Sequence, residues 1–280
     1  MNRLKKWSAV IYFLAFLAIS LGSQGLHLIT DYYWFREIDF TSVFNKILAT
    51  KMILGFSSSI LLALVLYANS WIAKIASRKP FVVIGPEVTV TSPLPMPQVA
   101  ELKPILRMLL VLFILGSSFF VGNWSAGQWE EVRKFMAGVP FGSQDPLFGR
   151  DIGFYVFKVP FYEFLFRFSL TSVICSAVVS AVIYILNARI YFTQRGVEIA
   201  EDTKSHFAIL GGLLCLLLCF YFQLKMFDLL TLERSLAPGA GYADVNAYLP
   251  GLKILRFLAL LSAVSLFLSP WFINQIDIRI

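Results

Sequence analysis

The sequence predicts an all-α fold, a polytopic transmembrane bundle of six spans with short amphipathic interfacial helices in its outer loops. Of its 280 residues, 58% are hydrophobic and only 15% are charged, whereas soluble domains carry roughly a quarter charged residues. Six segments are also apolar over about the 20 residues that a helix needs to cross a bilayer. They lie at about Trp7–Ile29, Met52–Ile72, Ile105–Val121, Phe161–Leu186, Phe207–Gln223 and Leu252–Phe272.

The first of these segments also resembles a secretory signal peptide, because a basic start precedes an apolar stretch. Its apolar run continues past Gly22 through Leu26 and Ile29, and no clear small-x-small cleavage site follows. We therefore expect an uncleaved first span.

The Lys and Arg residues set the expected orientation, because cytoplasmic loops carry an excess of them. With the N-terminus inside, half of the 24 basic residues fall on each side of the membrane, so the count alone does not decide the orientation. Arg3, Lys5 and Lys6 stand directly before the first span, and that flank usually dominates. We predict one transmembrane domain over residues 1–280 with both ends in the cytoplasm.

Two connections between spans are long enough to carry local structure. The cytoplasmic loop at 80–104 is proline-rich, which predicts an extended connection, and its VTVT segment could form a short strand. In the outer loop at 122–160, Ser125 and Gln128 have the spacing of a capping box, and Gly138 has the position of a helix C-cap. We predict a short interfacial helix between them.

Two other outer segments have an amphipathic pattern. After the aromatic cluster YYWF, an apolar residue falls at helical spacing from Phe40 to Ile47, which predicts a second short interfacial helix. The segment LKMFDLLTLERS is predicted to continue the fifth span beyond its apolar part.

Small residues recur every four positions inside three of the spans, which lets helix backbones approach closely in a membrane. We therefore expect a compact bundle. The three ridges are Gly55, Ser59 and Ala63; Ser172, Ser176 and Ser180; and Gly211, Cys215 and Cys219.

The sequence has no pattern for a cofactor, a metal ion or nucleic acid. Its two histidines, His27 and His206, are far apart, and its basic residues form no stripe with interleaved aromatics. The three cysteines lie inside apolar segments, where we expect packing rather than a disulfide. The ionisable residues lie in loops or near span ends, which disfavours an ion-coupled pump but leaves a passive pore or a scaffold open.

The stretch PFGSQDPLFGRDIGFYVF at 140–157 is rich in glycine, aspartate and aromatics within the outer loop. Asp145 followed by Pro146 fits a helix N-cap with proline at the first helical position, and Gly149 would end that single turn. We expect DIGFYVF to be extended or packed through its aromatics, and Pro160 to begin the fourth span.

Three stretches of the chain resemble a known family. VPFGSQDPLFGRDIGFYVFKVPFYEFL at 139–165 is similar to the signature of bacterial membrane proteins known as uncharacterised protein family 0182. YWFREIDFTSVFNKILATKMILGF at 33–56 and GAGYADVNAYLPGLKIL at 239–255 agree with it in the same order, although Ala243 stands where threonine is common. We expect a structural role for the signature positions Asp145, Pro146, Gly149, Asp151, Gly153, Tyr155, Tyr242 and Asp244.

The resemblance implies a multi-pass protein of the bacterial inner membrane with no established activity. The resemblance also implies that family members are long proteins, with about seven N-terminal spans followed by a large extracytoplasmic region. We therefore expect this chain to correspond to the N-terminal membrane part only. Its expected partners are the lipid bilayer and an extracytoplasmic region or other membrane proteins, with no nucleic acid.

Three functions follow as hypotheses. The leading one is a structural or anchoring membrane module that carries the extracytoplasmic region in full-length relatives. The alternative is a transport or channel component whose spans line a pathway. The third is an envelope-facing enzyme, which would need Asp145, Asp151 or Asp244 as acid or base. We assign no catalytic residue, cofactor or metal ligand.

Overall fold

A computed structural model describes the chain over residues 25–77, 83–84, 89–90, 97–187, 189–193, 196–231 and 239–276. This part is mainly helical. Besides a helix at 25–37, it contains α2 (Thr41–Ala76), α3 (Pro97–Gly127), α4 (Trp129–Ala137), α5 (Val159–Leu186), α6 (Glu201–Asp228) and α7 (Leu249–Ile276). Two π-helical segments, η1 (Phe154–Lys158) and η2 (Asp244–Tyr248), lead directly into α5 and α7. Two antiparallel strand pairs join β1 (Val83–Ile84) to β2 (Thr89–Val90) and β3 (Ile190–Thr193) to β4 (Gly196–Ile199).

Five of these helical stretches are long and apolar enough to cross a membrane. They run over Thr41–Ala76, Lys103–Gly127, Phe154–Leu186, Glu201–Asp228 and Asp244–Ile273. They contain the second to sixth predicted spans. Each is longer than predicted, because the helix continues beyond the apolar run, although the predicted end of the fourth span at Leu186 is confirmed. The first predicted span lies largely outside the described residues.

The predicted loop at 80–104 is only partly a loop. The strand prediction in VTVT is confirmed, since Val90 pairs with Val83 and Thr89 with Ile84. The loop prediction is wrong from Pro97 onward, where α3 already begins. A proline fits the first helical position because the amide there has no partner within the helix.

The interfacial helix predicted around Phe40–Ile47 is wrong as a separate element. Most of this segment is the first part of α2, which continues without a break to Ala76. The chain turns into α2 at Asp39, whose φ of 59° interrupts the preceding helix. Phe44 is buried against the rings of Tyr32 and Phe35.

The predicted capping box is also wrong. Ser125 lies inside α3 and is fully buried, and α4 begins at Trp129 without a side-chain cap from Gln128. Because the residues of α3 are mainly apolar, its helix continues past Ser125. The predicted end of α4 is confirmed, because Gly138 is its C-cap residue, although its backbone is extended rather than left-handed.

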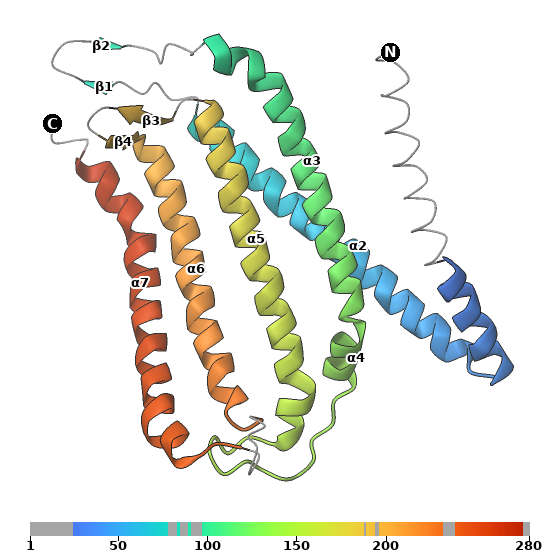
Figure 1. Cartoon of the computed structure of the whole chain (residues 1–280). Coiled ribbons are helices and arrows are strands. Elements are labelled where there is room, and N and C mark those ends of the chain that lie inside the picture. Colours follow the sequence, from blue (N-terminus) through green and yellow to red (C-terminus); the bar gives the residue numbers. More distant parts are fainter. Residues whose placement is uncertain are drawn as a thin grey trace. The chain divides into compact units, whose positions relative to one another are not determined.

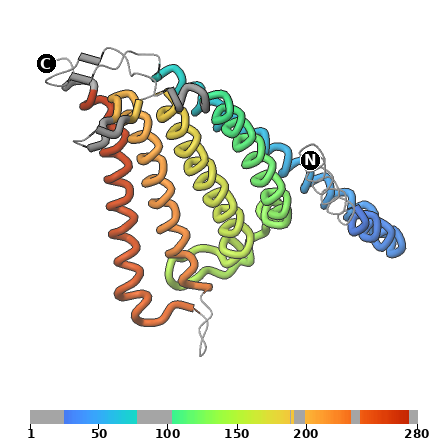
Figure 2. Tube along the Cα trace, turned by 45° about the horizontal axis from the view of Figure 1, so that its top comes forward, coloured from blue at the N-terminus to red at the C-terminus, as the bar shows by residue number. Residues whose placement is uncertain are grey.

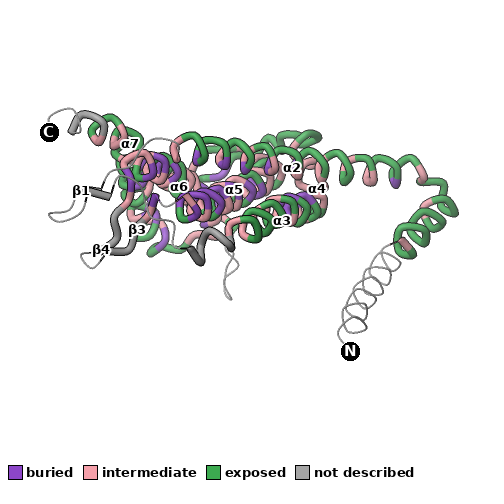
Figure 3. The backbone as a smooth tube through the Cα atoms, turned by 90° about the horizontal axis from the view of Figure 1, so that it is seen from above, coloured by how far each residue is buried: buried purple, intermediate pink, exposed green. Residues whose placement is uncertain are grey.

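The chain divides into two compact units, Met1–Ile53 and Leu54–Ile280. Within the second, α7, α6, α5 and α3 lie side by side in that order (Figure 1), and the same order is visible in the tilted view (Figure 2). Buried positions concentrate on α5 (Figure 3), whose most apolar window is 39% buried against 11–17% in the other spans. One apolar cluster joins α2, α3 and α5 through Leu62, Leu66, Ala73, Val121, Phe168, Val179, Ile183 and Tyr184.

The first small-residue ridge lies at a close helix contact. A Cβ atom added to Gly122 of α3 would lie 1.8 Å from the Ser59 hydroxyl and 2.7 Å from the carbonyl oxygen of Gly55. The predicted close packing is therefore confirmed for this ridge, between α2 and α3. The serine ridge of α5 is buried along its whole length. On α6 the close contact with α7 is at Gly212, where a Cβ would lie 2.7 Å from the Phe267 ring, and not at the predicted ridge residue Gly211, where a Cβ would lie 3.4 Å from Leu266.

Candidate functional site

The connection from α4 to α5 is built around the carboxylate of Asp145. Its Oδ1 accepts hydrogen bonds from the backbone N–H groups of Leu147 at 2.9 Å and Phe148 at 2.6 Å. Its Oδ2 accepts from the Arg150 N–H at 2.8 Å and from the Tyr155 hydroxyl at 2.7 Å. Asp145 itself is only 8% exposed. The carboxylate thus fixes a tight turn to the first residues of the next helix.

This turn has the form that the sequence predicts. Pro146 occupies its first position, and the Gly149 N–H donates to the carbonyl of Asp145 at 3.1 Å. Gly149 has φ +64°, a left-handed conformation that glycine adopts without steric cost. The prediction of a single capped turn at Asp145–Gly149 is confirmed.

Asp151 holds a second set of backbone amides. Its Oδ1 accepts from Phe141 at 3.0 Å and Gly153 at 2.7 Å, and its Oδ2 accepts from Gly142 at 2.8 Å. Gly153 fits closely here, since a Cβ atom would lie 2.6 Å from the Val139 carbonyl oxygen. Asp151 therefore ties the exit from α4 to the entry into α5.

The segment after Asp151 is helical, so of the two alternatives expected for DIGFYVF, extended or packed through its aromatics, the extended one is wrong. Helix begins at Ile152 and passes into η1, where the Val159 N–H donates to the carbonyl of Phe154. A proline in a helix crowds the carbonyl four residues earlier, and the wider π turn gives room for Pro160. Pro160 is thus the second residue of α5, within a helix already under way.

The aromatic packing expected for this segment is present. Phe227, near the end of α6, meets the rings of Phe148, Phe154 and Tyr155 at 5.3–5.8 Å between centroids. The Arg150 guanidinium lies 4.5 Å from the Phe154 ring centre and 5.4 Å from that of Phe227, which adds a cation–π attraction. The connection is therefore held to α6 as well as to α5.

The surroundings of the two aspartates favour their charged forms. Burial raises the pKa of the Asp145 carboxyl, but the bonds from Phe148, Tyr155, Arg150 and Leu147 outweigh it, so the pKa lies below its ordinary value of 3.8. The Phe141 amide, helped by the other two backbone donors, likewise lowers the pKa of Asp151 in spite of partial burial. Both are carboxylates at neutral pH.

The remaining signature positions lie at the entry into α7. Asp244 is 5% exposed, and its Oδ2 accepts from the Gly241 N–H at 2.8 Å, three residues back. This is the returning half of a capping box. Tyr242 is 84% exposed. Like α5, α7 follows a π segment and has proline, Pro250, at its second position.

Both signature segments meet the same end of α6. Leu147 and Phe148 come from the first segment, and Ala240 and Leu249 from the second. They pack on one apolar cluster with Met226, Leu229 and Leu252. The structure therefore brings the two segments to a common level of the bundle.

Comparison with known proteins identifies the family. The family model described as "Uncharacterised protein family (UPF0182)" matches residues 8–280 of this chain. The chain belongs to this family.

Curated UPF0182 relatives are much longer than this chain. A UPF0182 protein of Pelobacter propionicus is 33% identical over 259 residues, which cover 91% of this chain and 28% of the relative. Relatives from Geobacter sp. strain M21 and Moorella thermoacetica are each 32% identical, over 86% and 84% of this chain and 27% and 26% of their own lengths. The chain thus spans about a quarter of the length of these relatives. No solved structure matches it.

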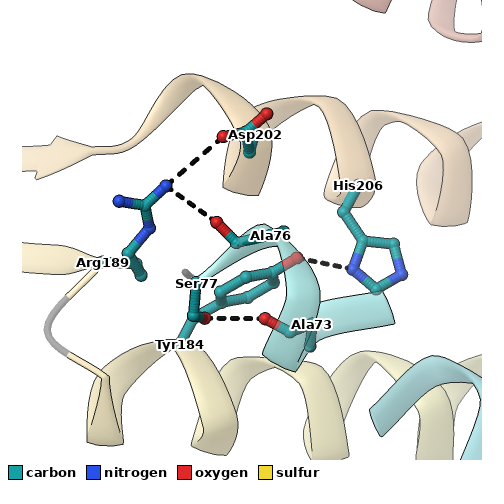
Figure 4. A network of polar contacts seen from close by, with 7 residues as sticks. All are labelled: Ala73, Ala76, Ser77, Tyr184, Arg189, Asp202 and His206. Atoms are coloured by element: carbon teal, nitrogen blue, oxygen red, sulfur yellow. Dashed lines mark hydrogen bonds and ion pairs between the residues drawn. The ribbon is translucent and has the colours of Figure 1, made fainter. Parts of the chain in front are cut away.

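A second polar site of this UPF0182 chain lies at the opposite end of α5 (Figure 4). Arg189, only 4% exposed, donates to the Ala76 carbonyl at the end of α2 at 3.0 Å and pairs with Asp202 of α6 at 3.4 Å. A cation beside the last carbonyls of a helix is stabilised by the helix dipole. Arg189 thus joins α2 and α6 across the end of α5.

His206 of α6 completes this network at the end of α5. Its Nδ1 lies 2.8 Å from the Tyr184 hydroxyl and its Nε2 lies 3.3 Å from Oδ1 of Asn69. Since an amide oxygen can only accept, Nε2 carries the hydrogen and Nδ1 accepts from the tyrosine. These bonds fit a neutral imidazole that links α2, α5 and α6.

Most of this network is not predicted from the sequence, in which His206 is an isolated histidine and Arg189 is one of 24 basic residues. The available signal was Asn69, an amide inside an otherwise apolar span, where polar side chains tend to hydrogen-bond between helices. In the described part of the UPF0182 chain, no three His, Cys, Asp or Glu side chains form a group that could hold a metal ion.

Proposed function

We propose that this chain is the membrane module of a UPF0182 protein in the bacterial inner membrane. In this proposal six spans form a bundle with a cytoplasmic N-terminus. The segment at about Trp7–Ile29 is the first span in chain order and adds to the five spans described above. The module anchors a large extracytoplasmic region in longer relatives and presents a rigid outer surface to it. The observation that carries the proposal is the use of the Asp145 and Asp151 carboxylates to fix the connection from α4 to α5.

The hydrogen bonds of these carboxylates favour a platform over an enzyme. Every oxygen of Asp145 and Asp151 accepts at least one bond from the chain itself. A general acid or base must reach a substrate atom and exchange a proton with it. A buried carboxylate with a lowered pKa and four internal donors is poorly suited to that exchange.

The packing between α2 and α5 favours a solid module over a transport pathway. Leu62, Leu66, Phe168 and Val179 fill the space between α2 and α5 well away from the helix ends. Among the described residues, the buried ionisable side chains of Asp145, Arg189, His206 and Asp244 all lie near the ends of helices. Coupled transporters instead place such groups near the middle of the membrane.

The outward faces of the spans support membrane insertion. Large apolar side chains are exposed on them, such as Phe119 and Phe120 at 70% and 71%, and Phe257 at 64%. A continuous apolar surface of this kind is unusual in water-soluble monomers. On the outer side, α4 fits an interfacial helix, because Phe135 stacks on Phe161 while Glu130 and Arg133 remain exposed.

Cysteine accessibility tests the proposed topology. In a variant whose three native cysteines are replaced by alanine, single cysteines are introduced at Ser143 and at Ser77. A membrane-impermeant thiol reagent added to intact spheroplasts should label the cysteine at 143 and spare that at 77. The reverse labelling, or equal labelling, would contradict the proposed orientation.

Alanine variants of the signature aspartates test the platform itself. Asp145→Ala and Asp151→Ala are expressed in a host without the native gene, with Glu130→Gln as a control that removes an exposed carboxylate from α4. We expect the two alanine variants to accumulate less in the membrane fraction, with any envelope phenotype following the amount of protein. Normal accumulation with a lost phenotype would instead support chemistry at these carboxylates.

A further inference from the structure

A pocket lies at the inner end of the bundle, where α2 and α5 end and α3 begins its span. Its volume is about 350 Å³. It combines two cations and an amide with apolar side chains. The residues that line it are Lys74, Arg107, Leu110, Val111, Ile183, Leu186 and Asn187.

The two cations of this pocket come from different helices. Lys74 is in the last turn of α2, and Arg107 is in α3. Both are exposed, and neither has an ion pair or hydrogen bond to another described residue. None of the described residues lining the pocket is acidic. Two like charges beside one pocket repel each other, and an anion between them would relieve that repulsion.

The two cations lie near the ends of their candidate membrane spans, where lipid phosphates are expected. Lys74 is two residues before the end of the span Thr41–Ala76, and Arg107 is four residues after the start of Lys103–Gly127. At a rise of about 1.5 Å per residue, each is roughly 3–6 Å from the end of its span. Asn187 directly follows the end of α5 at the same level.

The rest of the pocket is suited to a hydrocarbon chain. Ile183 and Leu186 are buried and form apolar walls on α5. Val111 lies one turn beyond Arg107 toward the middle of α3 and is 53% exposed. An apolar surface therefore leads from the cations toward the bilayer interior, where a free inorganic anion would gain nothing from it.

We propose that this pocket binds an anionic phospholipid. The phosphate lies between Lys74 and Arg107, the Asn187 amide donates to the headgroup, and an acyl chain follows Leu110 and Val111. The inference goes beyond the anchoring role but rests on the membrane insertion proposed for it. Basic pockets between helices on the cytoplasmic side are a recurring form of headgroup recognition.

Lipid titration of the full 280-residue chain in neutral detergent tests this proposal. Native mass spectrometry and thermal unfolding are followed with dioleoylphosphatidylglycerol, with dioleoylphosphatidylcholine and with sodium phosphate at matched ionic strength. We expect phosphatidylglycerol to bind more tightly than phosphatidylcholine. The double variant Lys74→Gln/Arg107→Gln should weaken phosphatidylglycerol binding about 30-fold, since each basic residue near a lipid surface contributes about 1 kcal/mol.

Two control variants isolate the pocket. Lys204→Gln removes a cation from the same end of the bundle, where it pairs with Glu201 at 2.6 Å, and should leave the lipid preference unchanged. Lys74→Arg/Arg107→Lys keeps both charges and should keep the preference. Circular dichroism shows whether each variant is folded, and the comparison of the two lipids on the unmodified chain needs no variant.

Three results would overturn the proposal. Equal affinity of the unmodified chain for both lipids would show that the cations act only as interfacial anchors. An unchanged lipid preference in the folded double variant would place the binding elsewhere. Phosphate that competes with phosphatidylglycerol at comparable concentration would indicate a soluble anion instead. Failure of the chain to float with vesicles would reject membrane insertion itself, which separates that proposal from this one.

Discussion

Replacement of Asp145 by asparagine changes one charge at the centre of the connection from α4 to α5 and keeps the size of the side chain. The amide oxygen of asparagine can still accept from Leu147 and Phe148. Its NH₂ group would face the Arg150 N–H, which lies 2.8 Å from the present Oδ2, and the Tyr155 hydroxyl at 2.7 Å. The tyrosine can rotate its hydrogen and accept, but the backbone amide cannot.

The cost follows from these contacts. A hydrogen bond to a charged group contributes roughly 1.5–3 kcal/mol, and a buried donor without a partner costs about 1–3 kcal/mol. Asp145→Asn loses one bond outright and weakens the others, so we expect a loss of about 3 kcal/mol. Asp145→Ala removes all four bonds and should cost about 4 kcal/mol or more.

Thermal unfolding in detergent, followed by circular dichroism, measures this loss. For a domain of this size, about 3 kcal/mol corresponds to a fall of roughly 6–12 °C in the melting temperature. Glu130→Gln is the matched control, because that carboxylate forms an exposed pair with Lys134. Such pairs are worth less than about 1 kcal/mol.

The comparison between Asp145→Asn and Glu130→Gln tests whether the buried carboxylate stabilises the connection from α4 to α5. A melting temperature of Asp145→Asn within error of Glu130→Gln would show that the buried carboxylate does not hold the connection. The hydrogen-bond argument for a rigid outer platform would then fail.

Three further predictions concern other parts of the bundle. Gly122→Ala should destabilise the chain by about 1–3 kcal/mol through overpacking against α2. Gly116→Ala is the control and should not destabilise it, because a Cβ atom there meets no atom within 4 Å. Chemical denaturation in detergent measures the stability of both variants. Tyr184→Phe leaves Nδ1 of His206 without its donor and should cost about 1–2 kcal/mol in the same assay. The contribution of Asp145 should be complete above pH 3.8 and disappear as the pH falls through its lowered pKa, so acid unfolding of the unmodified chain should be steeper than that of Asp145→Asn; parallel curves would contradict this.

Sequence reasoning succeeded where the interaction is local. Asp145 bonds amides two, three and five residues further along the chain, so residue type and spacing were enough to predict the turn. The five described spans were likewise visible as apolar runs. The end at Leu186 was placed correctly, whereas the other ends were misplaced because flanking residues also fold into helix once the apolar part is helical.

The missed features depend on residues far apart in the chain. Asn69 and His206 are separated by 137 positions, and no local pattern indicates that they meet. The π turn before α5 similarly involves Phe154, which packs on Phe227 of another helix. Such contacts are fixed by tertiary packing, which composition and periodicity do not specify.

The entries into α5 and α7 are built in the same way, which bears on how the signature should be interpreted. In each, an aspartate holds a backbone amide, a π turn follows, and a proline takes the second position of the helix. Both segments repeat this construction and pack on the same end of α6. A role in folding therefore explains their signature residues. The inner pocket differs, because Lys74 and Arg107 have no partner among the described residues. These exposed cations remain available to an anionic headgroup, so we expect binding at the cations rather than at the signature.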